Sequence, residues 1–312
     1  MCTRIFWSDH PVARVAARTM DWNCSDEPEL WVLPRGRERD GQLDDQAATW
    51  RSRFASVCLS AWQHGVTDCL NEAGLGVHLL YLEATEYEQP DARPGVSLLV
   101  AVSFLLDTCA TVVEALAALA TVRIVPREIR GRVLGAHLAI EDAAGDSAVI
   151  EFLAGRLHVH HGSEFAVMAN DPPFDRQLEL ARAYVPVGDQ PLPGDILSTD
   201  RFLRARYFLH YLPEPADQLQ AIAGILSVAG TVAVPFGAPY GGEGIYPTWW
   251  TSVADVTNRV YCFRASLSPN LVWLDLAGLD LAALTEPLQV DITDATLVGE
   301  LSPHLAPATP GF

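Results

Sequence analysis

The stretch GAHLAIEDAAGDSAVIEFLAGRLHVHHG, residues 135–162, contains runs of apolar and β-branched residues separated by short polar turns. The turn signals are DAAGD at 142–146 and AGR at 154–156, where aspartate and glycine favour chain reversal. Such a pattern is typical of consecutive β-hairpins. The stretch therefore predicts a set of antiparallel strands.

Similar strand-like runs open and close the chain, as RIFW (4–7), GVHLLYLE (76–83) and VADVTNRVYCFRA (253–265) show. Helical periodicity lies between these runs, at 97–119, 175–184, 199–211 and 215–228. No linker rich in proline, glycine or serine divides the chain. We expect two antiparallel sheets packed face to face with helices outside, in a single domain over residues 2–312.

Composition limits the class of protein and of partner. The 312 residues are 49% hydrophobic, enough for a large core, and the formal net charge is −18. Such a charge disfavours nucleic acid and anionic membranes as partners. The longest apolar run, 97–106, is too short to span a bilayer. No basic start followed by an apolar run indicates a secretory signal, so we expect a cytoplasmic protein with reduced thiols.

A cysteine directly follows the initiator methionine in MCTRIFWSDH (1–10). We expect Met1 to be removed because Cys2 is small. Cys2 would then carry a thiol with a pKa of about 8.5 and an α-amine with a pKa of about 7.7–8.0. The amine can take the thiol proton, so one residue would supply both nucleophile and base. The alternative is a buried cysteine that packs as a small hydrophobe.

A nucleophilic thiol needs positive charge nearby to favour the thiolate. The stretch ARTMDW (17–22) follows a turn, so its strand can return beside Cys2. Arg18 could then lower the thiol pKa, and Asp21 could hold the α-amine or the attacking thiol. The alternative for Arg18 and Asp21 is a surface ion pair.

Several motifs together resemble the choloylglycine hydrolases, over nearly the whole chain. They occur in the family's order as MCT (1–3), RTMDW (18–22), TDCLNEAGLGVHLLYLE (67–83), VMANDPPFD (167–175) and LPGDILSTDRFLRARY (192–207). That family comprises conjugated bile acid hydrolases and penicillin V acylases, which hydrolyse linear amides. The resemblance implies an αββα N-terminal nucleophile (Ntn) hydrolase sandwich of class α+β, with no metal or organic cofactor.

The resemblance also assigns roles to individual residues. Cys2 would be the nucleophile, and its freed amine the base and acid. Arg18 and Asp21 match the family's RxxDW/F motif. Arg201 matches the first arginine of the SRFVR-like helix start in the family and would place a charge near the nucleophile.

Two oxyanion donors are implied in the same way: the side-chain amide of Asn170 and the backbone N–H of Tyr81. Bile salt hydrolases typically carry asparagine where this chain has Tyr81, whereas penicillin V acylases carry tyrosine. The stretch 171–200 is short beside bile salt hydrolases, which use an inserted segment there for tetramer assembly. Both features resemble the Gram-negative penicillin V acylases, several of which also cleave N-acyl homoserine lactones. We expect a homo-oligomer, with dimer or tetramer left open.

An apolar pocket would bind the acyl group. Trp22, Leu82 and Tyr87 are the candidates to line it, the alternative being ordinary packing. His158 and His160 share one strand face, but no further ligand stands at a recognisable spacing, so we expect no zinc site.

The sequence therefore predicts a cysteine hydrolase of a small-molecule acyl amide, of the penicillin V or N-acyl homoserine lactone acylase type. The net charge of −18 slightly favours neutral lactones over glycine or taurine conjugates. Alternatives are a bile salt hydrolase or a specialised pathway acylase or acyltransferase. A non-catalytic small-molecule binding protein with the same fold is the alternative from another class.

Overall fold

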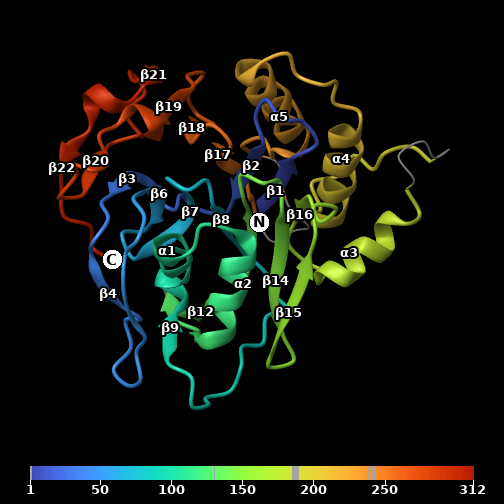
Figure 1. The fold of residues 1–312 in the computed structure, drawn as a ribbon. Coiled ribbons are helices and arrows are strands. Elements are labelled where there is room, and N and C mark those ends of the chain that lie inside the picture. The colour runs from blue at the N-terminus through green and yellow to red at the C-terminus, as the bar shows by residue number, and fades with distance from the viewer. Residues whose placement is uncertain (1, 130, 185–189, 238, 240–243) are drawn as a thin grey trace.

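Two largely antiparallel sheets lie face to face at the centre of the molecule, with helices on both outer faces (Figure 1). The computed structural model describes residues 2–129, 131–184, 190–237, 239 and 244–312. Among these residues no helix has the length and apolar character needed to cross a membrane.

The first sheet has seven strands, and the start of the chain forms the strand next to one of its edges. Its order is β16 (Val167–Met168), β1 (Cys2–Trp7), β2 (Val15–Asp21), β17 (Thr248–Asp255), β18 (Val260–Ala265), β19 (Val272–Asp275) and β21 (Gly299–Glu300). Strand β1 is thus held on both edges, by β2 and by β16.

The second sheet has nine strands. Its order is β15 (Arg156–His161), β14 (Ser147–Leu153), β13 (Ala136–Glu141), β8 (Gly76–Tyr81), β7 (Gly65–Asn71), β6 (Ser56–Ala61), β3 (Glu29–Leu33), β20 (Leu288–Val290) and β22 (Ala306–Pro307). Three two-stranded pairs accompany the large sheets: β4 (Glu38–Asp40) with β5 (Thr49–Arg51), β9 (Gly95–Ser97) with β10 (Arg123–Val125), and β11 (Glu128–Ile129) with β12 (Arg132–Val133).

The helices complete the layers. They are α1 (Leu98–Thr108), α2 (Val112–Thr121), α3 (Phe174–Ala181), α4 (Ser198–His210) and α5 (Gln218–Val232), with short 3₁₀ turns at Leu276–Gly278 and Ser302–His304. Helices α4 and α5 pack on β1 of the seven-stranded sheet, and α1 packs on β7 and β8 of the nine-stranded sheet. The predicted αββα sandwich is confirmed.

The predicted hairpins over 135–162 are confirmed as β13, β14 and β15, paired in the registers Leu138↔Ile150 and Ile150↔Val159. The second turn is closed by Gly155, whose φ of 69° is in the region that glycine adopts without strain.

The periodic stretch 97–119 differs from the expected single helix, because it forms α1 and α2. Cys109 is extended, with φ −121° and ψ 143°, and ends α1. Thr111 then accepts a hydrogen bond from the N–H of Glu114 at 3.2 Å, and Glu114 accepts one from the N–H of Ala110 at 2.8 Å. These two bonds resemble a capping box, with the Glu114 carboxylate accepting from the residue before the N-cap, and they begin a new helix despite the continuous apolar period.

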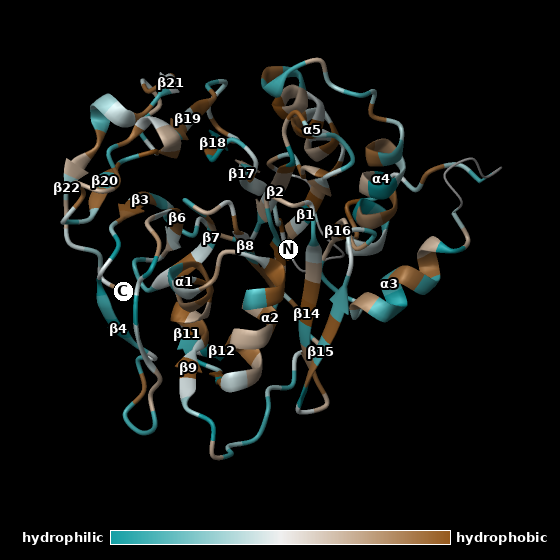
Figure 2. Ribbon diagram, in the orientation of Figure 1, coloured by the Kyte–Doolittle hydropathy of each residue, from teal (hydrophilic) through white to brown (hydrophobic). Residues whose placement is uncertain are grey.

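The core has three layers. An inter-sheet layer includes Leu59 and Val149. Ile5 and Ala17, on the strand face opposite to Cys2 and Arg4, belong to the layer under α4 and α5. A helix layer, between the nine-stranded sheet and α1, includes Leu105. In Figure 2 hydrophobic residues lie along the strands and helices, whereas the loops at the bottom of the view are mainly hydrophilic.

Candidate active site

Cys2 is the first residue of β1, and its side chain is buried in the inter-sheet layer. Strand pairing places Cys2 opposite Met20 and Arg4 opposite Arg18. The Cys2 backbone is also held on both sides, because its N–H donates to Asn170 Oδ1 and its carbonyl accepts from Arg201 Nη1 at 2.8 Å. The thiol is therefore placed by a rigid sheet and not by a loop.

Arg18 supplies the positive charge that the thiol was expected to need. Its Nη2 lies 3.5 Å from Cys2 Sγ and 3.4 Å from Met20 Sδ. The guanidinium stacks 4.7 Å above the Trp250 ring. Burial alone would lower the pKa of Arg18, but the charges of the Cys2 thiolate and Asp68 outweigh burial and raise the pKa. Arg18 thus remains a cation beside the sulfur.

Asn170, just after β16, connects the two sheets. Its Oδ1 accepts from the Cys2 N–H and from Arg201 Nη2 at 3.0 Å, while its Nδ2 donates to the Tyr81 carbonyl at 2.6 Å. Two donors converging on Oδ1 fix which way the amide points. Gln177 braces the residue by donating to its backbone carbonyl. An amide nitrogen has two hydrogens, so one N–H beyond that given to Tyr81 can serve a substrate oxygen.

Arg201 lies in the first turn of α4 and is fully buried. Its Nη1 donates to the Thr3 hydroxyl and lies 3.3 Å from Asp21 Oδ2. Asp21 in turn accepts from the Thr248 hydroxyl at 2.6 Å. Asp21 therefore reaches Cys2 through Arg201, and the expected direct bond from Asp21 to the α-amine or thiol stays a prediction.

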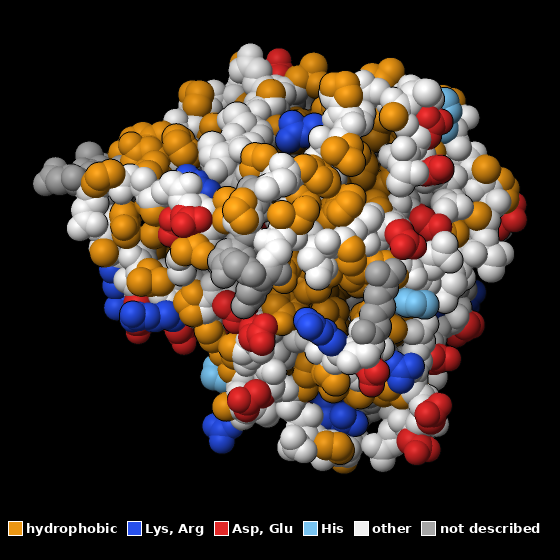
Figure 3. Space-filling view, turned by 180° about the vertical axis from the view of Figure 1, so that it is seen from behind, with side chains coloured by type: hydrophobic (Ala, Val, Ile, Leu, Met, Phe, Trp, Pro, Cys, Tyr) orange, Lys and Arg blue, Asp and Glu red, His pale blue; other side chains and the backbone are white. Residues whose placement is uncertain are grey.

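A cavity of about 330 Å³ lies beside this cluster, on the other side of Tyr81. It is lined by Trp22, Asn23, Cys24, Trp62, Tyr81, Ile129, Arg132, Val133 and Leu134. The rings of Trp22 and Tyr81 meet edge to face, with centroids 5.2 Å apart. The face opposite to that of Figure 1 carries a broad hydrophobic area, with charged side chains mainly toward its edges (Figure 3).

Two predicted pocket residues are placed elsewhere. Leu82 is 0% exposed, and its N–H donates to the Gly135 carbonyl at 3.3 Å. The Tyr87 hydroxyl donates to the Leu134 carbonyl at 2.8 Å, and its ring packs on Phe152 with centroids 5.2 Å apart. Neither side chain is among the described residues that line the cavity. Contact of Leu82 and Tyr87 with substrate stays a prediction.

A chain of buried charged side chains, which the sequence did not predict, runs from Arg18 to Arg4. Arg18 Nη1 lies 3.5 Å from Asp68 Oδ2, which is 2.6 Å from His78 Nδ1. His78 Nε2 is 2.6 Å from Glu141 Oε1, and Arg4 Nε donates to Glu141 Oε2 at 3.0 Å. A signal was present, since Arg4 begins the apolar strand-like run RIFW and His78 interrupts the run GVHLLY.

The charges in this chain reinforce one another. Burial alone would lower the pKa of His78, but Glu141 and Asp68 outweigh burial and raise it to about 9. Burial would raise the pKa of Glu141, yet Arg4 and His78 hold it at about 2. The pKa of Asp68 is also lowered against burial, mainly by His78. These side chains are therefore ionised at neutral pH.

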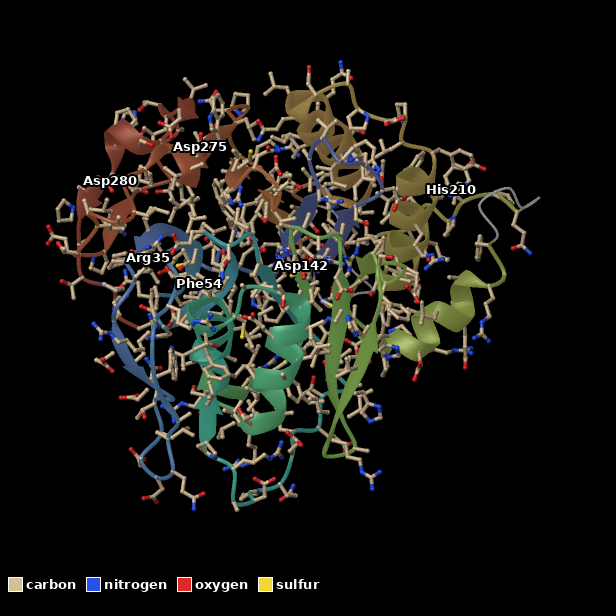
Figure 4. The ribbon with its side chains drawn as sticks, viewed as in Figure 1. Arg35, Phe54, Asp142, His210, Asp275 and Asp280 are labelled. Carbon is tan, nitrogen blue, oxygen red and sulfur yellow. The ribbon has the colours of Figure 1, made fainter. Side chains whose placement is uncertain are left out.

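Other candidate features lie away from the thiol. His161 Nε2 is 2.7 Å from Asp146, and within the described ranges no three His, Cys, Asp or Glu side chains form a group that could hold a metal ion. A cavity of about 390 Å³ between β1 and α4 is lined by His210, and one of about 420 Å³ by Arg35 and Asp280. Figure 4 shows these residues on opposite sides of the molecule. Neither cavity is lined by a predicted catalytic residue.

Comparison with known proteins gives independent evidence of the family. The family model for linear amide C–N hydrolases of the choloylglycine hydrolase family matches residues 2–296. A penicillin V acylase of Pectobacterium atrosepticum is 31% identical over 99% of this chain and 91% of its own. A bile salt hydrolase/transferase of Bifidobacterium longum subsp. longum is 26% identical over 90% of this chain and 97% of its own.

Among solved structures, penicillin V acylase from Agrobacterium tumefaciens superposes with a TM-score of 0.90 at 32% identity, covering 99% of this chain and 98% of that one. The family match spans every predicted site residue and all strands of the two large sheets except β21 and β22. This chain belongs to the choloylglycine hydrolase family and is a linear amide C–N hydrolase.

Proposed function

We propose that this enzyme cleaves a small acyl amide of the penicillin V or N-acyl homoserine lactone type, with Cys2 as the nucleophile. The observation that carries the proposal is a shared contact at Asn170. Its side chain holds the Cys2 N–H on one side and, on the other, the carbonyl of Tyr81, which lines the aromatic-walled cavity. A substrate acyl group in that cavity would have its carbonyl near the thiol.

The proposed reaction begins with removal of Met1, which lies outside the described residues. The nitrogen that donates to Asn170 Oδ1 would then be the Cys2 α-amine. This amine takes the thiol proton, and the thiolate, next to Arg18, attacks the amide carbon. Asn170 Nδ2 and the Tyr81 backbone N–H meet the oxyanion. The protonated amine gives its proton to the leaving nitrogen as the C–N bond breaks, and water then hydrolyses the thioester.

Cavity size and lining support an aromatic or medium alkyl acyl group. A volume of about 330 Å³ is at the lower end of the range for ligand pockets, roughly 300–1,000 Å³. Each buried CH₂ of an acyl tail contributes roughly 0.8 kcal/mol, so tail length would set selectivity. The penicillin V acylase relatives support the same substrate class. The relative named bile salt hydrolase/transferase supports acyl transfer to a second amine as the next candidate.

The test compares kcat/KM for penicillin V, N-acyl homoserine lactones of graded length, and glycocholate. We expect penicillin V or a lactone to be cleaved at least about ten times faster than glycocholate, a difference of about 1.4 kcal/mol in transition-state binding. Glycocholate as the fastest substrate would contradict the substrate class and leave the Cys2 mechanism intact.

The start of the active chain can be tested separately. The sequence contains no lysine, so an amine-reactive label reports only the α-amino group. Intact mass combined with this label should show Cys2 as the first residue of active protein, because a retained Met1 would turn the base into an amide nitrogen. Fully active protein that begins at Met1 would contradict the mechanism. Assembly into a dimer or tetramer, a cytoplasmic location and a single domain over 2–312 stay predictions.

A further inference from the structure

We propose that His78 is a positioning residue for the reaction: held between two carboxylates, it leaves the charge of Arg18 available to the Cys2 thiolate. This inference rests on the proposed role of Cys2 as the nucleophile. The His78 ring nitrogens face Asp68 and Glu141, and His78 is not among the described residues that line the cavity, so it would act through Asp68 and Arg18.

Hydrogen bonding at His78 requires both ring nitrogens. Nδ1 is 2.6 Å from Asp68 and Nε2 is 2.6 Å from Glu141, and all three side chains are 0% exposed. A neutral imidazole has one N–H and can donate to only one carboxylate, whereas the imidazolium donates to both. A ring placed between two buried carboxylates at these distances is therefore held as a cation.

The signs of charge alternate along the chain. Arg4, His78 and Arg18 are cations, while Glu141 and Asp68 are anions, so one positive charge is in excess. The Arg18 end of the chain is the one that lies 3.5 Å from Cys2 Sγ. With a thiolate at Cys2, the net charge of these five side chains and the sulfur is zero. Without the His78 charge, the two carboxylates would balance the two guanidinium groups, and no excess would remain for the sulfur.

Other groups that face Arg18 must be included in this balance. Asp26 lies behind Trp250, whose Nε1 donates to both carboxylate oxygens at 2.9 and 3.1 Å. Burial raises the pKa of Asp26 to about 6, against the Trp250 hydrogen bond and the charge of Arg18. The remaining partners of Arg18 are the Thr67 carbonyl at 3.3 Å and Met20, both uncharged. Above pH 7 Asp26 is therefore ionised and reduces the excess positive charge equally in the wild type and in each variant, so it does not change their comparison.

Neighbouring residues are arranged to accommodate this chain of charged side chains. Tyr261, on β18, donates its hydroxyl to the second oxygen of Asp68. Gly76 pairs with Glu141 in the sheet, and a Cβ at Gly76 would collide with Glu141 Oε1. Ser147 accepts from Arg4 Nη2 at 3.0 Å. The Asp68 and Arg4 charges thus each have a hydrogen-bonding neighbour, and Gly76 leaves room for the Glu141 carboxylate.

The experiment measures the pH midpoint at which iodoacetamide labels Cys2, read from the Cys2 peptide by mass spectrometry, together with the pH profile of kcat/KM. The variant is His78→Gln, and we expect its midpoint to move by about half a pH unit or more toward alkaline pH. The matched control is His137→Gln, since His137 is also 0% exposed and faces a single carboxylate, Glu151, at 3.4 Å. The control midpoint should match that of the wild type.

A second pair of variants separates charge from loosened packing. Asp68→Asn removes the anion that competes for Arg18, so its labelling midpoint should move toward acid, opposite to His78→Gln. Loosened packing would move both midpoints in the same direction, and that result would overturn the proposal. Tyr261→Phe removes only a hydroxyl and should give a smaller alkaline shift, because Asp68 then engages Arg18 more strongly. If His78→Gln does not fold, Asp68→Asn and Tyr261→Phe still decide by their opposite signs.

The two proposals fail in different ways. Hydrolysis that survives Cys2→Ala overturns the proposed nucleophile. An inactive Cys2→Ala together with an unchanged midpoint in folded His78→Gln overturns only the role of His78.

Discussion

The inter-sheet layer and the helix layer of the core are built from different chemistry. Between the sheets, Arg4, Arg18, Asp68, His78 and Glu141 are buried among apolar side chains. The layer under α1 consists mainly of apolar side chains, with a smaller polar group in which Asp107 accepts from Trp50 at 2.7 Å and lies 3.4 Å from Arg39. Buried charges cost several kcal/mol each before they are paired. The sandwich interior is therefore specialised for holding the thiol, and the helix layer for stability.

The contrast is tested most strongly by removing one buried thiol from each layer. Cys2→Ala should fold and lose hydrolysis to below detection, because the proposed nucleophile is gone. Cys109→Ala, at the end of α1, should keep the wild-type kcat/KM and lose about 1 kcal/mol of unfolding free energy. Activity assays and denaturant unfolding measure the two effects. Comparable loss of activity in both variants would remove the distinction between the layers.

Asn170→Ala should have the next largest effect. We expect kcat to fall by about 10²–10³ with little change in KM, because an oxyanion donor acts mainly in the transition state. The same side chain holds the Cys2 N–H, so the loss should not be smaller than that of one donor. Steady-state kinetics on the best substrate measures the split. A change confined to KM would assign Asn170 to substrate binding.

Asp26→Asn tests the charged inter-sheet layer through the pH dependence of the free energy of unfolding. The pKa of Asp26 is raised to about 6 in the folded protein, so the folded state holds the proton more tightly than the unfolded state. Wild-type stability should fall as the pH rises from about 4 to 6, by on the order of 3 kcal/mol from this group. The substituted amide does not titrate, so the variant should gain stability relative to wild type across that range. Thermal unfolding at pH 4 and pH 7 decides, and a constant difference would contradict the assignment.

Local patterns were enough to predict most of the fold. The hairpins over 135–162 are encoded by period-two alternation and turn residues that lie next to each other in sequence. The break between α1 and α2 was missed because apolar spacing continues across it, whereas the deciding signal is the side-chain cap formed by Thr111 and Glu114.

The site was predictable where a motif is contiguous. Arg18 and Asp21 share one strand end with a recognisable spacing, and the structure places Arg18 on Cys2. The chain of buried charged side chains was not predictable in this way, since Glu141 is 63 residues from His78 and 137 from Arg4 along the sequence.

The alternating charges also constrain how the two sheets meet. Arg4 and Arg18 come from the seven-stranded sheet, whereas Asp68, His78 and Glu141 come from the nine-stranded sheet. If one sheet slid past the other by a residue, guanidinium groups would face hydrocarbon and carboxylates would lose their partners, at a cost of several kcal/mol per ion. Apolar side chains alone tolerate such slips far better. The chain of charged side chains thus favours a single relative position of the two sheets. In that position Asn170 bridges Cys2 and Tyr81.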